Sequence, residues 1–190
     1  MADDGNNTQT VILDAALIEV LAHGIRRTTA ADVARRSGVS RQTVYRYWPD
    51  VHALFASLVT RELLAVVPTL TSAESLDEVV TLLVTTAERI RDLPLIHRLR
   101  ESDPELFGRY ILKRLGTSQR RIHELITVTL VRAQLNGAVR DANAEELAAM
   151  VLLIAQSAVQ SAHLMSPWLD HDAWKRELGT VLRGYLAPVS

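Results

Sequence analysis

The sequence predicts an all-α protein of about nine helices, with a three-helix N-terminal module followed by a larger helical domain. Apolar residues recur at intervals of three and four along the chain rather than at intervals of two, which indicates helices and not strands. Turn dipeptides do not stand between alternating segments, so hairpins are not indicated. The content of 48% hydrophobic and 23% charged residues is typical of a folded globular protein.

The N-terminal module is expected over residues 10–52, after a flexible tail over residues 1–9. Its first helix is predicted over residues 11–23, where Ile12 and Val20 belong to one apolar face and Gly24 ends the helix.

The second and third helices are marked by their capping residues. Thr29 with Asp32 three residues later is a capping-box pattern, which predicts a helix over residues 30–37. Gly38 suits a tight turn, and Ser40 is the expected N-cap of a third helix that ends near Trp48. Two short helices joined by such a turn are typical of a helix-turn-helix.

The remaining helices fall in residues 53–190, the expected larger helical domain, except that the fourth helix begins at residue 51. Capping residues and breakers mark them, including Ser75 before Glu78, Asp103 before Pro104, Asn143 before Glu146, and Asp170 or Asp172 for the last helix. The predicted helices cover residues 51–66, 76–93, 94–101, 104–116, 117–135, 144–165 and about 172–186.

Charge is concentrated in one segment of a nearly neutral chain. Lys and Arg number 21 against 22 Asp and Glu, but residues 24–48 contain six arginines and one aspartate. A local cationic segment favours a nucleic-acid contact.

Several classes of protein and site are not expected. The chain has no cysteine, so disulfides and thiolate metal sites are excluded, and the default location is the cytoplasm. A signal peptide is not recognisable, and the apolar run from residue 147 is too short for a membrane span. Metalloprotease, nucleophile-elbow and phosphate-loop motifs are missing, and the six histidines are scattered. We therefore expect no catalytic residues, no metal and no cofactor.

An ordered set of short motifs resembles the signature of the TetR family of repressors. It consists of residues 28–29, 32–34, 38–40 and 43–48, and the likeness extends over about residues 11–55. This set is far more specific than a generic helix-turn-helix pattern. The resemblance implies a DNA-binding transcriptional regulator, most often a repressor that binds a palindromic operator as a homodimer and is released by a small-molecule effector.

The resemblance also implies which residues contact double-stranded operator DNA. Thr29 would meet a phosphate, and Arg41 and Gln42 would suit guanine and adenine by bidentate geometry. The full implied set is Thr29, Ser40, Arg41, Gln42, Thr43, Tyr45, Arg46, Tyr47 and His52.

Two positions depart from the family pattern. Val51 stands where the family usually has a phosphate-binding lysine, and Glu19 stands where an apolar residue is common. His52, an arginine or the backbone amides of the fourth helix could replace the lysine. Glu19 could rotate the first helix slightly or lie at the edge of the core.

The last two helices resemble the pair through which family members dimerise, although they could also just complete an intramolecular core. The implied interface residues are Leu152, Gln156, Val159, Gln160, His163, Trp174, Leu178, Val181, Leu182 and Tyr185, with the two glutamines and His163 setting the register. The middle helices resemble the ligand domain, and a small apolar or amphipathic effector would suit a pocket there, with a filled core as the alternative. Its implied lining is Ile90, His97, Phe107, Tyr110, Ile111, Ile122 and Ile126.

The competing interpretation is a helical ligand-binding or scaffold protein whose degenerate helix-turn-helix lacks specific DNA binding. Val51 is the strongest argument for it.

Overall fold

The computed structural model describes residues 3–67, 75–102 and 116–188, and within these ranges the protein is all-helical. Nine α-helices and one short 3-10 helix are present there, without any strand, so the predicted fold class is confirmed. The chain divides into two compact units. Unit 1 contains residues 1–64 and 93–116, and unit 2 contains residues 65–92 and 117–190.

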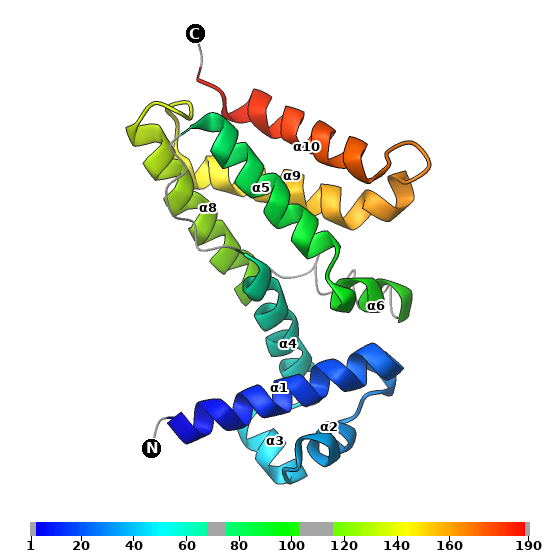
Figure 1. Cartoon of the computed structure of the whole chain (residues 1–190). Helices are drawn as coiled ribbons and strands as arrows, with labels where there is room; N and C mark the ends of the chain where they lie inside the picture. The colour runs from blue at the N-terminus through cyan, green and yellow to red at the C-terminus, as the bar shows by residue number, and fades with distance from the viewer. Residues whose placement is uncertain (1–2, 68–74, 103–115, 189–190) are drawn as a thin grey trace. The chain divides into compact units, whose positions relative to one another are not determined.

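Unit 1 is built around the N-terminal helices. It contains α1 (Asp3–His23), η1 (Ile25–Arg27), α2 (Ala30–Ser37), α3 (Arg41–Tyr47), nearly all of α4 (Val51–Val66) and α6 (Pro94–Ser102) (Figure 1). Side chains from all five α-helices form one apolar core, whose most buried members include Ile12, Val20, Val33, Val44, Leu54, Leu58 and Leu95. The predicted helix-turn-helix is thus held by a core shared with α4 and α6 rather than by α1–α3 alone.

Helix α6 is fastened to the end of α1 within unit 1. Arg98 donates a hydrogen bond of 3.1 Å from Nη2 to the carbonyl oxygen of Ala22. Gly24 has a φ of +79°, and a Cβ at this position would lie 3.0 Å from the Cβ of Ser102. Both the positive φ and the close approach of α6 therefore require glycine here.

Unit 2 consists of α5 (Leu76–Arg91), α8 (Thr117–Leu135), α9 (Ala144–Met165) and α10 (His171–Leu186) (Figure 1). Helix α9 packs on α8 and α5, and α10 packs on α5 and α9. Trp174 of α10 donates a hydrogen bond of 3.1 Å from Nε1 to the carbonyl oxygen of Ala158, and the Arg91 guanidinium lies 4.8 Å from the centre of its ring. Trp174 therefore joins three helices of the unit.

The predicted helix limits agree closely with the structure where capping residues define them. The limits predicted for residues 30–37, 51–66, 117–135 and 144–165 are those of α2, α4, α8 and α9. Asp170, the first of the two proposed caps, begins α10 by accepting a hydrogen bond from the amide of Ala173. The helix predicted over residues 104–116 lies almost wholly outside the described residues.

Two expectations differ from the structure at the N-terminal side. Helix α1 begins at Asp3, within the segment expected to be a flexible tail. The short helix η1 was not predicted, and unit 1 extends to residue 64 and includes residues 93–116, beyond the expected limit of 52.

Truncating Leu182 is expected to destabilise unit 2 strongly. Leu182 on α10 is 0% exposed, so Leu182→Ala should lower the free energy of unfolding by about 2–5 kcal/mol through lost burial and a cavity. Denaturant unfolding of the purified protein measures this change. Its neighbour Val181 is 51% exposed, and Val181→Ala, measured at equal protein concentration, should cost much less. Equal losses for the two variants would contradict the packing of α10.

Candidate nucleic-acid interface

Helix α3 is held by one buried edge. Gly38 ends α2 in the left-handed conformation at φ +72°, and the hydroxyl of Ser40 caps α3 by accepting a hydrogen bond of 3.0 Å from the amide of Thr43. Val44 and Trp48 are buried, and Trp48 Nε1 donates a hydrogen bond of 2.8 Å to the hydroxyl of Ser57 on α4. This anchoring leaves the other side of α3 exposed on a rigid support.

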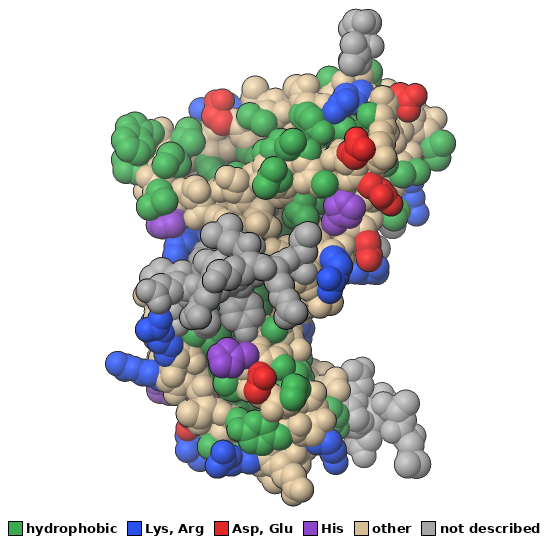
Figure 2. Space-filling view, turned by 180° about the vertical axis from the view of Figure 1, so that it is seen from behind, with side chains coloured by type: hydrophobic (Ala, Val, Ile, Leu, Met, Phe, Trp, Pro, Cys, Tyr) green, Lys and Arg blue, Asp and Glu red, His purple; other side chains and the backbone are tan. Residues whose placement is uncertain are grey.

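The exposed side of α3 carries polar and cationic groups. A shallow surface hollow is lined by Ser40, Gln42, Thr43, Tyr45 and Arg46, all of which were predicted to contact DNA. Figure 2 shows Lys and Arg side chains along the lower edge of unit 1. A helix with an anchored apolar edge and an outer face of hydrogen-bonding groups has the form that enters a major groove about 12 Å wide.

The cationic side chains of α3 differ in how they are restrained. Arg46 donates a hydrogen bond of 3.2 Å from Nη2 to the hydroxyl of Tyr47, and its guanidinium lies 5.0 Å from the centre of that ring. Arg41 and Gln42 are exposed and make no side-chain hydrogen bond within the described residues. Arg46 is therefore preorganised by Tyr47, whereas Arg41 and Gln42 keep their hydrogen-bonding groups for a ligand.

The predicted phosphate contact of Thr29 has a local competitor. The hydroxyl of Thr29 donates a hydrogen bond of 2.6 Å to Asp32 Oδ2 and also accepts from the amide of Asp32, so the capping box is formed. Hydrogen bonds from the side chain and the backbone of Thr29 lower the pKa of Asp32, with a smaller contribution from Arg35. An ionised carboxylate at the start of α2 opposes a phosphate there, so the contact by Thr29 remains a prediction.

The first turn of α4, where the family's lysine would bind a phosphate, is capped by the carboxylate of Asp50. Asp50 Oδ1 accepts a hydrogen bond of 2.8 Å from the amide of Ala53, which occupies part of the site that could have bound a phosphate in place of the family's lysine. Val51 is half-buried and His52 is exposed. Of the alternatives to the lysine, backbone amides at this helix end are therefore the least favourable.

Glu19 is buried inside unit 1 rather than at an edge of its core. Its Oε1 accepts a hydrogen bond of 2.7 Å from Arg36 Nε on α2, and its Oε2 lies 3.5 Å from His23 Nε2. A buried carboxylate requires such a partner to offset the loss of hydration. At the position where the family pattern commonly has an apolar residue, Glu19 therefore joins α1 to α2 by an ion pair with Arg36.

Removing the carboxylate of Glu19 is expected to destabilise unit 1 moderately. Glu19→Ala should lower the free energy of unfolding by about 1–3 kcal/mol, because a charge-assisted hydrogen bond is lost while Arg36 can turn to solvent. The matched control on the same helix is Asp14→Ala, which removes an exposed ion pair to Arg61 and should cost less than about 1 kcal/mol. Thermal unfolding of the three proteins measures both values. A change no larger than that of the control would contradict the role of Glu19.

Comparison with known proteins identifies the family. Residues 12–58 match the family model of the bacterial regulatory proteins of the tetR family. An HTH-type transcriptional regulator of Mycobacterium bovis is 42% identical over 187 residues, which cover 98% of each chain. A corresponding regulator of Mycobacterium tuberculosis is 42% identical over 189 residues, again with 98% coverage of both chains. The chain belongs to the TetR family of transcriptional regulators. Members of this family regulate transcription and are not enzymes.

Solved TetR-family structures share the fold over nearly the whole chain. A TetR-family regulator from Pectobacterium atrosepticum has 19% identity and a TM-score of 0.72, covering 98% of this chain and 97% of its own. A SmeT–triclosan complex has 22% identity and a TM-score of 0.63, covering 94% and 90% of the two chains. At these identities the likeness establishes the fold.

The residues proposed for the TetR-type dimer interface are distributed over several environments in unit 2. Val159, Trp174, Leu178 and Leu182 are buried within the chain itself. Gln156 Oε1 accepts a hydrogen bond of 3.4 Å from Gln119 on α8, and the Arg140 guanidinium lies 4.7 Å from the centre of the Tyr185 ring. Leu152 and Gln160 are half-buried, whereas His163 and Val181 are exposed.

The sequence prediction missed two exposed leucines of α9. Leu153 is 60% exposed and Leu164 is 59% exposed. Figure 2 shows hydrophobic side chains gathered on the visible face of unit 2. Helix α9 is also long and apolar enough to cross a membrane by those two criteria, but helices that pack in soluble proteins meet them too. Helix α9 contains more apolar residues than the core of unit 2 buries. This excess was the sequence signal that could have identified the exposed side of α9 that carries Leu153 and Leu164.

The residues proposed to line an effector pocket are divided between the two units. Ile122 and Ile126 are buried on α8 and Ile90 is half-buried on α5, all in unit 2. His97 is exposed on α6 of unit 1. Phe107, Tyr110 and Ile111 lie outside the described residues. The structure therefore brings only the α5 and α8 members into one unit.

Proposed function

We propose that this TetR-family regulator is a repressor, which binds a palindromic operator as a homodimer and is released by a small-molecule effector. The observation that carries this proposal is the exposed face of α3, in which Gln42, Thr43, Tyr45 and Arg46 surround one hollow while Val44 anchors the helix. Recognition of base edges requires hydrogen-bonding side chains on a helix that is held rigidly by its own protein.

The groups available on α3 suit specific recognition. Arg41 can bind a guanine by two hydrogen bonds, and Gln42 can do the same for an adenine. Each good bidentate contact contributes about 1–3 kcal/mol of discrimination between bases. Two such contacts in each of two half-sites are enough to distinguish an operator from other DNA.

The outer face of α9 supports the homodimer. Leu153, Ser157, Gln160 and Leu164 follow one another at intervals of four, three and four residues, so they share one side of the helix. Leu153 and Leu164 are the strongly exposed apolar members of this side. A second copy, placed with two-fold symmetry, would cover both leucines.

The neighbouring helix α10 contributes to the same proposed interface. Val181 is exposed, and a Cβ added at Gly184 would meet no atom within 4 Å. A small residue beside exposed apolar groups permits close approach of a partner helix. We therefore assign the dimer to the outer faces of α9 and α10, with Leu153, Leu164 and Val181 as its apolar contacts in place of the buried Trp174, Leu178 and Leu182.

A mobility-shift titration tests specific DNA binding. The probe is the promoter of the protein's own gene, and the competitor is DNA of the same length and base composition with scrambled sequence. We expect a specific complex whose affinity falls steeply as salt concentration rises, because phosphate contacts release counterions. Equal affinity for the two DNA molecules at every salt concentration would reject the proposal.

Effector release is tested in the same assay. An effector that changes the population of the DNA-binding state from 99:1 to 1:99 must bind the two states with affinities that differ by about 5.5 kcal/mol. Compounds that raise the melting temperature of the free protein are added to the complex with DNA. An effector should dissociate the complex, and Ile126→Val, which reshapes the predicted pocket lining on α8 with a small loss of volume, should change that response. If stabilising compounds never alter operator affinity, effector release is refuted.

The alternative is a scaffold or ligand-binding protein with a helix-turn-helix that has lost specific DNA binding. The observation that favours it is Val51, together with the Asp50 carboxylate at the start of α4. This alternative predicts weak binding without preference between operator and scrambled DNA, so the same titration distinguishes the two functions.

A further inference from the structure

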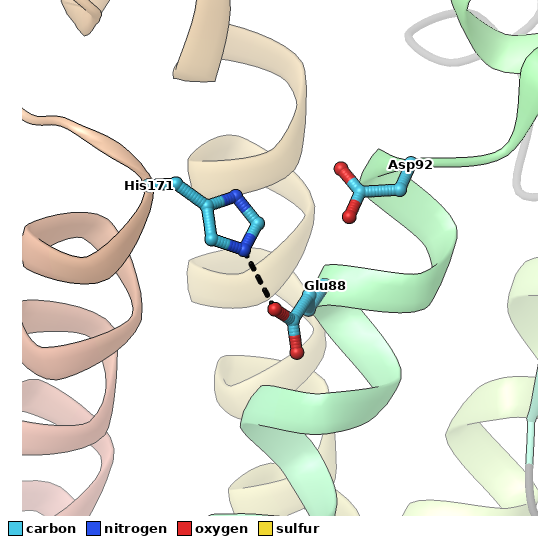
Figure 3. A group of neighbouring side chains, drawn as sticks. All are labelled: Glu88, Asp92 and His171. Atoms are coloured by element: carbon cyan, nitrogen blue, oxygen red, sulfur yellow. Dashed lines mark hydrogen bonds and ion pairs between the residues drawn. The ribbon is translucent and has the colours of Figure 1, made fainter.

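We propose that Glu88, Asp92 and His171 of unit 2 form a binding site for a divalent transition-metal ion. These three side chains come from two helices and approach one another at one end of the pair (Figure 3). Their candidate ligand atoms, two carboxylate oxygens and an imidazole nitrogen, all lie within 4.8 Å of one another.

The backbone of α5 and α10 explains the convergence. Glu88 and Asp92 are four residues apart at the end of α5, so their carboxylates lie on the same side of that helix. His171 is the first residue of α10, which packs on α5. His171 is far from the two acids in the sequence, and for that reason ligand spacing did not predict a metal site.

The donor set fits a transition metal of the Zn²⁺ type. Imidazole nitrogen and carboxylate oxygen both bind Zn²⁺ at about 2.0–2.2 Å. His171 Nε2 lies 2.7 Å from Glu88 Oε1, whereas two ligands of a tetrahedral ion are about 3.3–3.5 Å apart. A small rotation of either side chain therefore makes room for the ion, and three protein ligands leave a coordination position for water.

The charges around the cluster both favour and oppose a cation. Lys175 Nζ lies 2.8 Å from Glu88 Oε1 and carries one positive charge. The hydrogen bond from Lys175, followed by that from His171, lowers the pKa of Glu88. The hydrogen bond to Glu88, with smaller contributions from the charges of Asp172 and Asp92, raises the pKa of Lys175. A metal ion must therefore displace an ammonium group that the carboxylates of the cluster attract.

The site lies next to the point where the chain leaves unit 2, so a bound ion would restrain the chain there. Asp92 is the last residue of its segment of unit 2, and the chain enters unit 1 at Leu93. An ion held by Asp92 and His171 would fasten the end of α5 to the start of α10, directly before this crossing.

Zn²⁺ titration of the full-length protein by calorimetry tests the site. We expect one Zn²⁺ per chain, and at least a tenfold loss of affinity in His171→Ala. The matched control is His163→Ala, which removes an exposed histidine of α9 outside the cluster and should leave the affinity unchanged.

Lys175→Met supplies the test that separates a metal site from an ion-pair network. Removing the competing ammonium should tighten Zn²⁺ binding severalfold, while a network without a metal function gives no saturable binding in either protein. Circular dichroism verifies that each variant is folded. Absence of saturable binding in the wild-type protein, or equal affinities for wild type and His171→Ala, would overturn the proposal.

Discussion

Replacing Arg41 and Gln42 together by alanine is expected to reduce operator affinity by about 1000-fold or more, to the level of binding to scrambled DNA. The two side chains are exposed on α3 and are not engaged by neighbours within the described residues. Loss of two base contacts at about 1–3 kcal/mol each, in both half-sites, totals about 4–12 kcal/mol, which is comparable with the advantage of about 4–10 kcal/mol that separates an operator from other sequences. Mobility-shift titrations of wild type and variant at one fixed salt concentration measure the ratio.

The control for charge is Arg176→Ala, which removes an exposed arginine from α10 in unit 2. This variant should keep the operator affinity of the wild type. Unfolding curves of the double variant should also match the wild type, because neither α3 side chain contributes to the core. A double variant that still prefers the operator would show that the outer face of α3 does not read the sequence.

Placing carboxylates on the outer face of α9 is expected to separate the proposed dimer into monomers. In Leu153→Glu combined with Leu164→Glu, two-fold symmetry would bury four charges in an apolar contact, and desolvation of unpaired charges costs several kcal/mol. The dimer dissociation constant should rise by more than a thousandfold, and operator binding should be lost with it. Sedimentation velocity over a range of protein concentrations measures the association.

Leu135 provides a matched control for this experiment. It is 85% exposed at the end of α8 and does not belong to the proposed interface on α9 and α10, so Leu135→Glu should remain a dimer and bind DNA. Should the α9 double variant also remain dimeric, the proposed interface would be refuted, while the groove-reading role of α3 would still stand.

Local sequence signals predicted the helix limits and the support of α3 well. Thr29, Gly38 and Ser40 act through hydrogen bonds and backbone angles within four residues, and these can be anticipated from the order of residues alone. The exposed polar side of α3 was likewise anticipated, because its residues belong to a single helix whose buried edge was recognised from Val44 and Trp48.

Features that depend on distant partners were not predictable in the same way. The environment of Glu19 depends on Arg36 of another helix, and that of Trp174 depends on Ala158 and Arg91. Helical periodicity identified α10 as amphipathic, but it could not tell whether its apolar face meets α5 and α9 or a second subunit. The structure gives Leu182 to the intramolecular core and leaves Val181 exposed.

The discontinuity of unit 1 limits how the protein can be dissected. The polypeptide passes between the two units after residues 64, 92 and 116, and Leu95 and Leu99, which follow the second crossing, complete the core around α1. A recombinant fragment that stops at residue 52 or 64 therefore lacks two of its interior leucines. Such a fragment should have a lower free energy of unfolding than unit 1 in the 190-residue chain. DNA-binding measurements should therefore use the 190-residue chain.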